Sequence, residues 1–199
     1  MTRNSSEVVR KGFYFNQRNC IGCKTCQIAC KDKNDLDVGV LFRHVNDYEV
    51  GSYPNAKGYH YAATCNHCID PACVAVCPNA ATFVDKDDGT VQHEDEKCIG
   101  CEYCVKACPY GVPHYIASIQ KAHKCDACVL LRASGERPAC VASCPMRALE
   151  FGPIEELRAL HPEAVNSIVV LPDASQTNPS IAVDPKPAAL EPDPVRVVL

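Results

Sequence analysis

Sixteen cysteines constrain the fold of this chain more than any other feature of its sequence. They fall into four groups of four, and the same spacing recurs along the chain. Every group begins with C-x-x-C and ends with C-x-x-x-C, so that only the middle gap varies. The groups are Cys20, Cys23, Cys26 and Cys30; Cys65, Cys68, Cys73 and Cys77; Cys98, Cys101, Cys104 and Cys108; and Cys125, Cys128, Cys140 and Cys144.

The fixed ends of each group suit metal coordination. A C-x-x-C loop brings two thiolates to one site, and two cysteines four positions apart lie about one turn apart on a helix. Proline follows the fourth cysteine in groups two, three and four, whereas Lys31 stands there in group one. The run C-x2-C-x2-C-x3-C-P binds [4Fe–4S] clusters, and its fourth cysteine ligates the other cluster of a pair. Sixteen thiolates therefore predict four [4Fe–4S] clusters.

Other uses of the cysteines fit less well. Structural zinc prefers two separated ligand pairs, a pattern that group four would fit alone but that groups one and three do not. Disulfides need an oxidising compartment and suitably spaced Cα atoms, which clustered cysteines do not favour. Lys24 lies inside group one, and we consider that its charge raises the potential of that cluster or that it is simply solvated. Because the thiol count is complete, we expect four histidines to be neighbours or surface residues, namely His67, His93, His114 and His123.

The bulk composition excludes several classes of protein. The 199 residues suffice for one or two domains, and a net charge of −4 with mixed signs gives no basic face for nucleic acid. The apolar stretches are too short to span a bilayer, and the first residues contain no apolar run or twin arginine, so we expect no transmembrane segment and no export signal. We find no nucleotide-binding loop and no catalytic constellation, which predicts a non-catalytic chain.

Between the cysteine groups the sequence predicts short strands and turns. Residues 12–16 are a candidate strand, and apolar–polar alternation on both sides of Asp88 and Gly89 indicates a hairpin. Residues 148–152 form a second candidate strand, and residues 152–163 a helix with prolines near its two ends. The proline-rich tail, residues 172–199, is either disordered or an extended strap that becomes ordered on a partner.

Four stretches together resemble a known family. They are "CIGCKTCQIACKD", "CNHCIDPACVAVCP", "CIGCEYCVKACPYG" and "KCDACVLLRASGERPACVASCPMRALEFGPIEELR". Over residues 12–172 the chain resembles the iron–sulfur subunit of the dimethyl sulfoxide reductase family of molybdopterin oxidoreductases. The eleven-residue gap of group four is the most specific feature, and lysine in place of proline after Cys30 also fits the family.

The resemblance implies an α+β fold of two pseudo-symmetric ferredoxin-like modules with short β-hairpins and helices. Groups two and three would form one module, residues 59–114. Groups one and four would form the other, residues 12–58 with residues 115–171, and residues 172–199 would be the tail. The sequence supports this nesting, because one hairpin joins groups two and three, while the strand before group one and the strand after group four can pair with each other.

The resemblance also implies which cysteines share a cluster. Relatives that carry a three-iron cluster lack a cysteine where this chain has Cys101, so four four-iron clusters are expected. The implied ligands are Cys20, Cys23, Cys26 and Cys144 for the first cluster; Cys125, Cys128, Cys140 and Cys30 for the second; Cys65, Cys68, Cys73 and Cys108 for the third; and Cys98, Cys101, Cys104 and Cys77 for the fourth.

The role implied by the resemblance is electron transfer within a membrane-associated complex in anaerobic respiration. Single electrons would pass between a quinol-oxidising membrane anchor subunit, facing groups two and three, and a molybdopterin catalytic subunit, facing groups one and four. The partner's twin-arginine signal would carry the protein to the outer face of the cytoplasmic membrane, with a cytoplasmic location as the alternative. The same role in a thiosulfate or polysulfide reductase, a dehydroxylase or a transhydroxylase stays open, as do a free-standing polyferredoxin and a zinc-bound scaffold.

Overall fold

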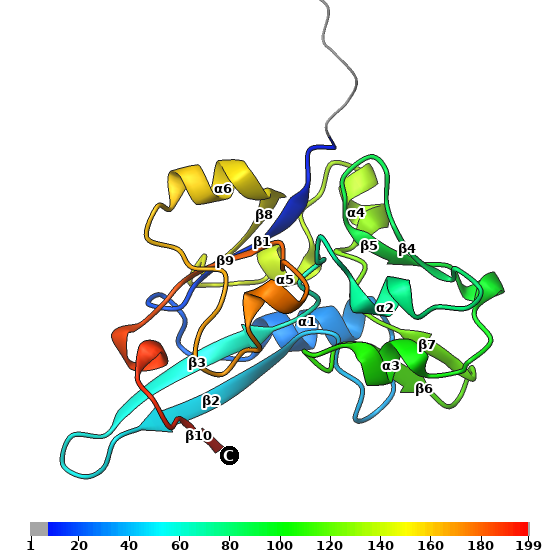
Figure 1. Cartoon of the computed structure of the whole chain (residues 1–199). Helices are drawn as coiled ribbons and strands as arrows, with labels where there is room; N and C mark the ends of the chain where they lie inside the picture. Colours follow the sequence, from blue (N-terminus) through cyan, green and yellow to red (C-terminus); the bar gives the residue numbers. More distant parts are fainter. Residues whose placement is uncertain (1–7, 199) are drawn as a thin grey trace, which may run out of the picture.

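Four small sheets organise the mixed α/β fold of this chain, which a computed structural model describes over residues 8–198 (Figure 1). Part of the N-terminal stretch expected to lack an export signal, residues 1–7, lies outside the described residues. The strands are β1 (Lys11–Asn16), β2 (His44–Val50), β3 (Lys57–Ala63), β4 (Thr82–Val84), β5 (Val91–His93), β6 (His114–Ile116), β7 (Lys121–His123), β8 (Leu149–Pro153), β9 (Ile181–Asp184) and β10 (Val195–Val197). The helices are α1 (Thr25–Lys33), α2 (Ala72–Ala75), α3 (Tyr103–Ala107), α4 (Val129–Ala133), α5 (Ala139–Ala142) and α6 (Ile154–Leu160), with 3-10 turns η1 (Asp95–Lys97), η2 (Ala174–Gln176) and η3 (Pro187–Leu190).

The strand expected before group one is β1, and it is the centre of a three-stranded sheet of order β8-β1-β9. It pairs antiparallel with β8, so the pairing anticipated between the strands that flank groups one and four is confirmed. Both faces of β1 are covered, because Tyr14 packs with Ile154 and Leu157 of α6 while Phe13 and Phe15 pack in the main core. Its four central residues are therefore all buried, without the alternation of a half-exposed strand. Phe13 and Phe15 of this strand belong to the main hydrophobic core.

The C-terminal tail, expected to be either disordered or a strap that becomes ordered on a partner, packs against the rest of the chain over residues 172–198. Strand β9 pairs in parallel with β1, and β10 pairs with β2. The physical reason is burial: Ile181, Ala182 and Val183 are consecutive apolar residues that lie in the core. Just before β9, the tail crosses group two, where the Ile69 amide donates to the carbonyl oxygen of Asn178 at 2.8 Å.

The hairpin and the helix expected from the sequence are both present. Strands β4 and β5 pair antiparallel on either side of Asp88 and Gly89, and α6 lies inside the expected helical range. The cysteine helices are shorter than a full C-x-x-x-C pattern in three groups. Only α1 contains both its third and fourth cysteines, whereas α2, α3 and α5 end before the fourth. Proline after that cysteine disfavours a helical conformation there, and α1 has Lys31 instead.

A long hairpin, β2–β3, was not anticipated, although its connection contains the turn residues Gly51, Pro54 and Asn55. It extends from the body in Figure 1, while α2, α3 and the hairpins β4–β5 and β6–β7 gather on the opposite side. Both expected module boundaries fall inside strands, at residue 58 within β3 and at residue 114 within β6. In the described part of the chain, no helix is sufficiently long and apolar to cross a membrane.

Candidate iron–sulfur sites

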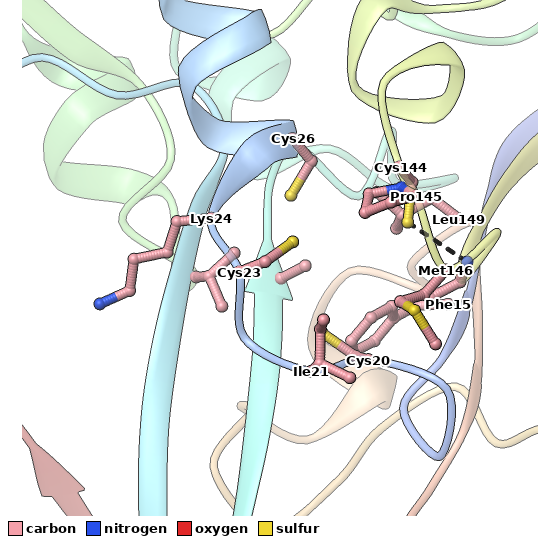
Figure 2. A pocket seen from close by; sticks show the side chains of 13 residues that line it. Phe15, Cys20, Ile21, Cys23, Lys24, Cys26, Cys144, Pro145, Met146 and Leu149 are labelled. Atoms are coloured by element: carbon pink, nitrogen blue, oxygen red, sulfur yellow. Dashed lines mark hydrogen bonds between the residues drawn. The ribbon is translucent and has the colours of Figure 1, made fainter.

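One cavity brings together cysteines from the first and last groups (Figure 2). Cys20 follows β1, Cys23 lies in the loop before α1, and Cys26 is in the first turn of that helix. Cys144 follows α5 and faces the same space from the other side. Most of the remaining wall is apolar, with Phe15, Val45, Ala62, Pro145, Met146 and Leu149. The four cysteines expected at the first cluster therefore lie around one cavity.

Two further cavities have the same make-up of three cysteines from one group and one from another. These sets are Cys77 with Cys98, Cys101 and Cys104, and Cys108 with Cys65, Cys68 and Cys73. The remaining set is wholly buried and comprises Cys30, Cys125, Cys128 and Cys140. Burial, together with the nearby charges of the other three cysteines of this set, raises the pKa of Cys30. The structure thus brings together the same four sets that the family resemblance implied, and their ligation of clusters stays a prediction.

The C-x-x-C loops share one backbone feature. In all four, the residue before the second cysteine has a positive φ: 68° at Gly22, 43° at His67, 68° at Gly100 and 55° at Ala127. Glycine is required at two of these positions, because a Cβ on Gly22 would lie 2.6 Å from the His60 ring and one on Gly100 would lie 2.5 Å from the Gln120 carbonyl oxygen. The left-handed turn shapes each loop so that its two thiols reach the same cavity.

The four cysteine sets differ in how far they are buried. The set that contains Cys30 is completely buried, and in the set that contains Cys65 only Cys108 is not fully buried. In the set that contains Cys98 every cysteine is partly accessible, and in the first set Cys23 is exposed. Two sets therefore lie in the interior, and two lie near the surface.

Several of the buried thiols keep their protons at neutral pH. Burial raises the pKa of Cys26 to about 11, that of Cys68 to about 11 and that of Cys73 to about 12. Metal ligation deprotonates a thiol outright, so binding of a metal centre at these sites would release protons.

The residues present fit iron–sulfur clusters. All sixteen cysteines lie within the described residues and are free thiols. Backbone amides donate to several of the sulfurs, from Ala81 to Cys77 Sγ at 3.2 Å, and from Ala148 to Cys144 Sγ at 3.3 Å. Such N–H···S contacts are among the features that set cluster potentials. Convergent free thiols, apolar walls and amide donors together match what thiolate-bound clusters require.

Comparison with known proteins agrees with this chemistry. The family model of a 4Fe-4S dicluster domain matches residues 56–154, and that of a 4Fe-4S binding domain matches residues 18–35. The B subunit of the anaerobic dimethyl sulfoxide reductase of Escherichia coli K12 is 43% identical over 182 residues, which are 87% of this chain and 88% of the relative. The corresponding B subunit of Haemophilus influenzae is 45% identical over 185 residues, with the same coverage. The E. coli K12 protein YnfG, a probable anaerobic dimethyl sulfoxide reductase subunit, is 45% identical over 182 residues, again 87% and 88% of the two proteins.

This protein belongs to the family of dimethyl sulfoxide reductase B subunits. The resemblance of the four cysteine stretches is thereby confirmed. Its matches to 4Fe-4S domains agree with this family, and the protein accordingly is an electron-transfer subunit of a reductase complex and not its catalytic subunit.

Two buried basic side chains, Arg43 and Lys124, were not anticipated from the sequence of this B subunit. The Arg43 guanidinium is fully buried, donates from Nη1 to the carbonyl oxygen of Ala62 at 2.9 Å and lies 4.7 Å from the Phe13 ring centroid. The Lys124 ammonium donates to the carbonyl oxygens of Val91 and Cys125. Nothing in the sequence separates these two residues from the other lysines and arginines, because only the tertiary packing places them among the cysteines.

No histidine is needed to complete a cysteine set, because each set already contains four thiols. His67 is fully buried and its Nδ1 accepts from the Val91 amide at 3.0 Å. His114 Nε2 lies 3.0 Å from the carbonyl oxygen of Leu41. His93 lines the same cavity as Cys98, and it lies near His123 across Asp95.

Lys24 lines the first cavity, but it also forms an ion pair with Asp47 at 3.2 Å. That carboxylate offsets part of the lysine's charge, because an opposite charge at this distance weakens its field at the cavity. An effect of Lys24 on the potential stays a prediction, which a redox titration of Lys24→Ala would test.

Proposed function

We propose that this protein relays single electrons through four [4Fe–4S] clusters between a quinol-oxidising membrane anchor and a molybdopterin catalytic subunit in anaerobic respiration. Oxidation of a quinol releases two electrons and two protons, and the relay would carry the electrons one at a time. The proposed ligand sets are Cys20, Cys23, Cys26 and Cys144; Cys125, Cys128, Cys140 and Cys30; Cys65, Cys68, Cys73 and Cys108; and Cys98, Cys101, Cys104 and Cys77.

The observation that carries this proposal is the gathering of the cysteines into these four sets, each with one member from a different group. Three of the sets line cavities, and the fourth is a buried cluster of thiols. Two accessible sets and two buried sets are what a relay needs, because electrons enter and leave at the surface and cross the interior.

Two ferredoxin-like modules follow from the same grouping. Helix α1 packs against α5, and α2 packs against α3, so each pair of groups contributes two neighbouring helices. Boundaries at residues 63/64 and 123/124 leave every strand intact, which the boundaries expected from the sequence do not. The tail belongs with the module of groups one and four, because β9 and β10 pair with its strands.

The partners would dock at the two accessible sets. Ile21 and Met146 line the first cavity and are exposed, which supports a protein contact there. Ile99 lines the cavity of the fourth set and is 61% exposed. We assign the first face to the catalytic subunit and the second to the membrane anchor, by analogy with the family. The complex would lie on the outer face of the cytoplasmic membrane, carried there by the partner's signal.

The proposed terminal acceptor is dimethyl sulfoxide, because the relatives named above are subunits of dimethyl sulfoxide reductases. Purification of the intact complex and identification of its large subunit test this assignment. If the large subunit is that of a thiosulfate reductase, a polysulfide reductase or another molybdopterin enzyme, the terminal acceptor is the substrate of that enzyme instead. Recovery of the protein alone would favour a free polyferredoxin, and zinc without acid-labile sulfide would contradict the cluster chemistry.

Serine variants test the exchange of ligands between groups. Cys77→Ser should alter the same cluster signal as Cys98→Ser in an electron paramagnetic resonance titration of the complex, because both belong to one set. Cys65→Ser, the control within the group of Cys77, should alter a different signal. If Cys77→Ser and Cys65→Ser affect one and the same cluster, each group binds its own cluster and the proposed sets are wrong.

A further inference from the structure

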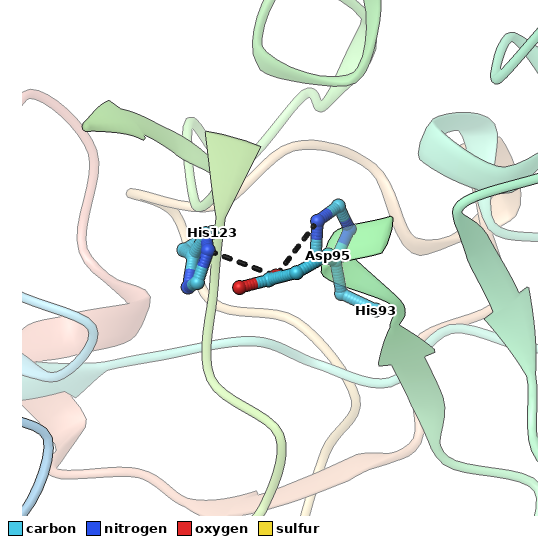
Figure 3. A group of neighbouring side chains, drawn as sticks. All are labelled: His93, Asp95 and His123. Atoms are coloured by element: carbon cyan, nitrogen blue, oxygen red, sulfur yellow. Dashed lines mark ion pairs between the residues drawn. The ribbon is translucent and has the colours of Figure 1, made fainter. Parts of the chain in front are cut away.

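A second kind of metal-binding arrangement lies between two hairpins (Figure 3). His93 is the last residue of β5, Asp95 begins η1, and His123 is the last residue of β7. The hairpins β4–β5 and β6–β7 thus bring three side chains from two separate segments to one point. Their donor atoms all lie within 4.8 Å of one another.

Two of the three separations of these atoms are close to those in a metal site. Asp95 Oδ1 lies 3.0 Å from His123 Nε2 and 3.5 Å from His93 Nε2. Ligands at 2.0–2.1 Å from a tetrahedral zinc ion are about 3.3 Å apart, a value between the two distances. Small rotations of the side chains would therefore bring all three atoms into bonding range of one ion.

The imidazole nitrogens that face Asp95 have no other partner. Nε2 of His93 and Nε2 of His123 are both buried and form no hydrogen bond with the described residues. The other nitrogen of His93, Nδ1, lies 3.2 Å from the Thr82 hydroxyl oxygen. When Nδ1–H donates to that hydroxyl, Nε2 presents a lone pair toward the carboxylate. In this tautomer a cation between the two acceptors would satisfy both of them, and an outer contact of this kind is typical of a metal-bound histidine.

The surroundings select the type of cation. Lys121 donates to the backbone carbonyl of Asp95, and the Lys124 ammonium lies nearby in the interior. One carboxylate beside two lysines disfavours Mg²⁺ and Ca²⁺, which bind through several oxygens. Two imidazoles with one carboxylate suit zinc and related transition metals. The Asp95 side chain is 50% exposed, so a fourth coordination position would open to solvent.

We propose that His93, Asp95 and His123 bind a divalent transition metal ion, with Zn²⁺ as the expected occupant. This site is separate from the sixteen cysteines and does not depend on the proposed electron relay. The ion would cross-link β4–β5 to β6–β7 beside the cavity of the fourth cysteine set, whose wall includes His93.

Zinc binding to the cluster-loaded complex tests the proposal. The protein is freed of loose metal with a chelator under anaerobic conditions and dialysed against Zn²⁺, and retained zinc is measured by elemental analysis. X-ray absorption at the zinc edge distinguishes the sites, since nitrogen and oxygen ligands lie near 2.0–2.1 Å and cysteine sulfur near 2.3 Å. One zinc per protein molecule with only nitrogen and oxygen neighbours is expected.

Variants assign the ligands. His93→Gln and His123→Gln should abolish zinc retention, and Thr82→Val should weaken it roughly 10- to 100-fold through loss of the outer contact. His161→Gln is the matched control, because His161 also faces a carboxylate, Glu150 at 3.3 Å, away from this site. Iron content verifies that each variant keeps its clusters. If a histidine variant loses iron, Asp95→Asn, at a more exposed position, is tested in its place. Sulfur neighbours of zinc, no retained zinc, or equal retention by these variants would overturn the proposal.

Discussion

Replacing Arg43 with glutamine should lower the potentials of the clusters nearest to it. The cysteines whose thiolate charges would act most strongly on this guanidinium are Cys140, Cys26, Cys125 and Cys30. Three of these cysteines belong to the buried second set and one to the first. In the described part of the chain, Nε and Nη2 of Arg43 have no hydrogen-bond partner. Its positive charge is therefore directed at the electron path without a carboxylate to neutralise it.

The size of the effect follows from the burial of the guanidinium. A unit charge that acts over about 6–10 Å at an effective dielectric constant of ~20 changes the energy of an added electron by about 2–3 kcal/mol. With about 2.3 kcal/mol per 100 mV for one charge, the potential should fall by about 70–120 mV. The second cluster should shift more than the first, because three of the four cysteines belong to it.

The assay is a potentiometric titration of the intact complex, followed by electron paramagnetic resonance. Arg43→Lys is the matched control, since it keeps the charge and should keep the potentials near those of the wild type. Iron content identifies any variant that has lost a cluster. Equal potentials in wild type and Arg43→Gln, with the same iron content in both, would refute the electrostatic reasoning. Equal shifts in Arg43→Gln and Arg43→Lys would point to altered packing instead.

Two further predictions concern stability and local geometry. Asp88→Asn leaves the Arg132 guanidinium, 11% exposed, without its carboxylate and should destabilise the protein by about 2–3 kcal/mol in denaturant titrations. Burial by itself raises the pKa of Asp88. The hydrogen bonds to its carboxylate lower the pKa by more than burial raises it, so the net pKa lies below the usual value. The Asp88 carboxylate therefore stabilises the folded protein above pH ~4, and this stabilisation is lost as the pH falls. Only the wild type should lose it in acid; an equal fall in the free energy of unfolding of both proteins would contradict this. Gly100→Ala should reduce the iron content at the fourth set, because the new Cβ would lie 2.5 Å from the Gln120 carbonyl oxygen. Gly111 also has a positive φ, but an added Cβ there would meet open space, so Gly111→Ala should keep its iron. Equal losses of iron in the two variants would show that backbone strain alone is responsible.

The sequence predicted those features that the chemistry of the cysteines dictates. The repeated spacing indicated the four groups of cysteines, the family resemblance implied the four sets that gather in the structure, and turn residues led to the β4–β5 hairpin. Helix lengths were less predictable, because a proline after the fourth cysteine ends three helices early while Lys31 lets α1 continue.

Contacts between distant segments could not be predicted from local patterns. The proline-rich tail has the composition of a disordered segment, yet Ile181 to Val183 pair with β1, a strand from the opposite end of the chain, and are buried. The burial of Arg43 and the meeting of His93 with His123 depend in the same way on tertiary packing. A single sequence carries no signal for such pairs.

The positions of the cysteines and of the tail in the chain decide when each cysteine set can be completed during synthesis. The fourth set is complete once Cys104 has been made, whereas the first must wait for Cys144. The third set gains its cover last, when Thr177 reaches the Tyr110 hydroxyl, 3.0 Å away, and the neighbourhood of Cys68. Pairing between the two ends of a polypeptide is slow to form, because a long loop must close first. The first set and the cover of the third therefore form late, and a polypeptide that still lacks its tail would present Cys68 without the contact from Thr177.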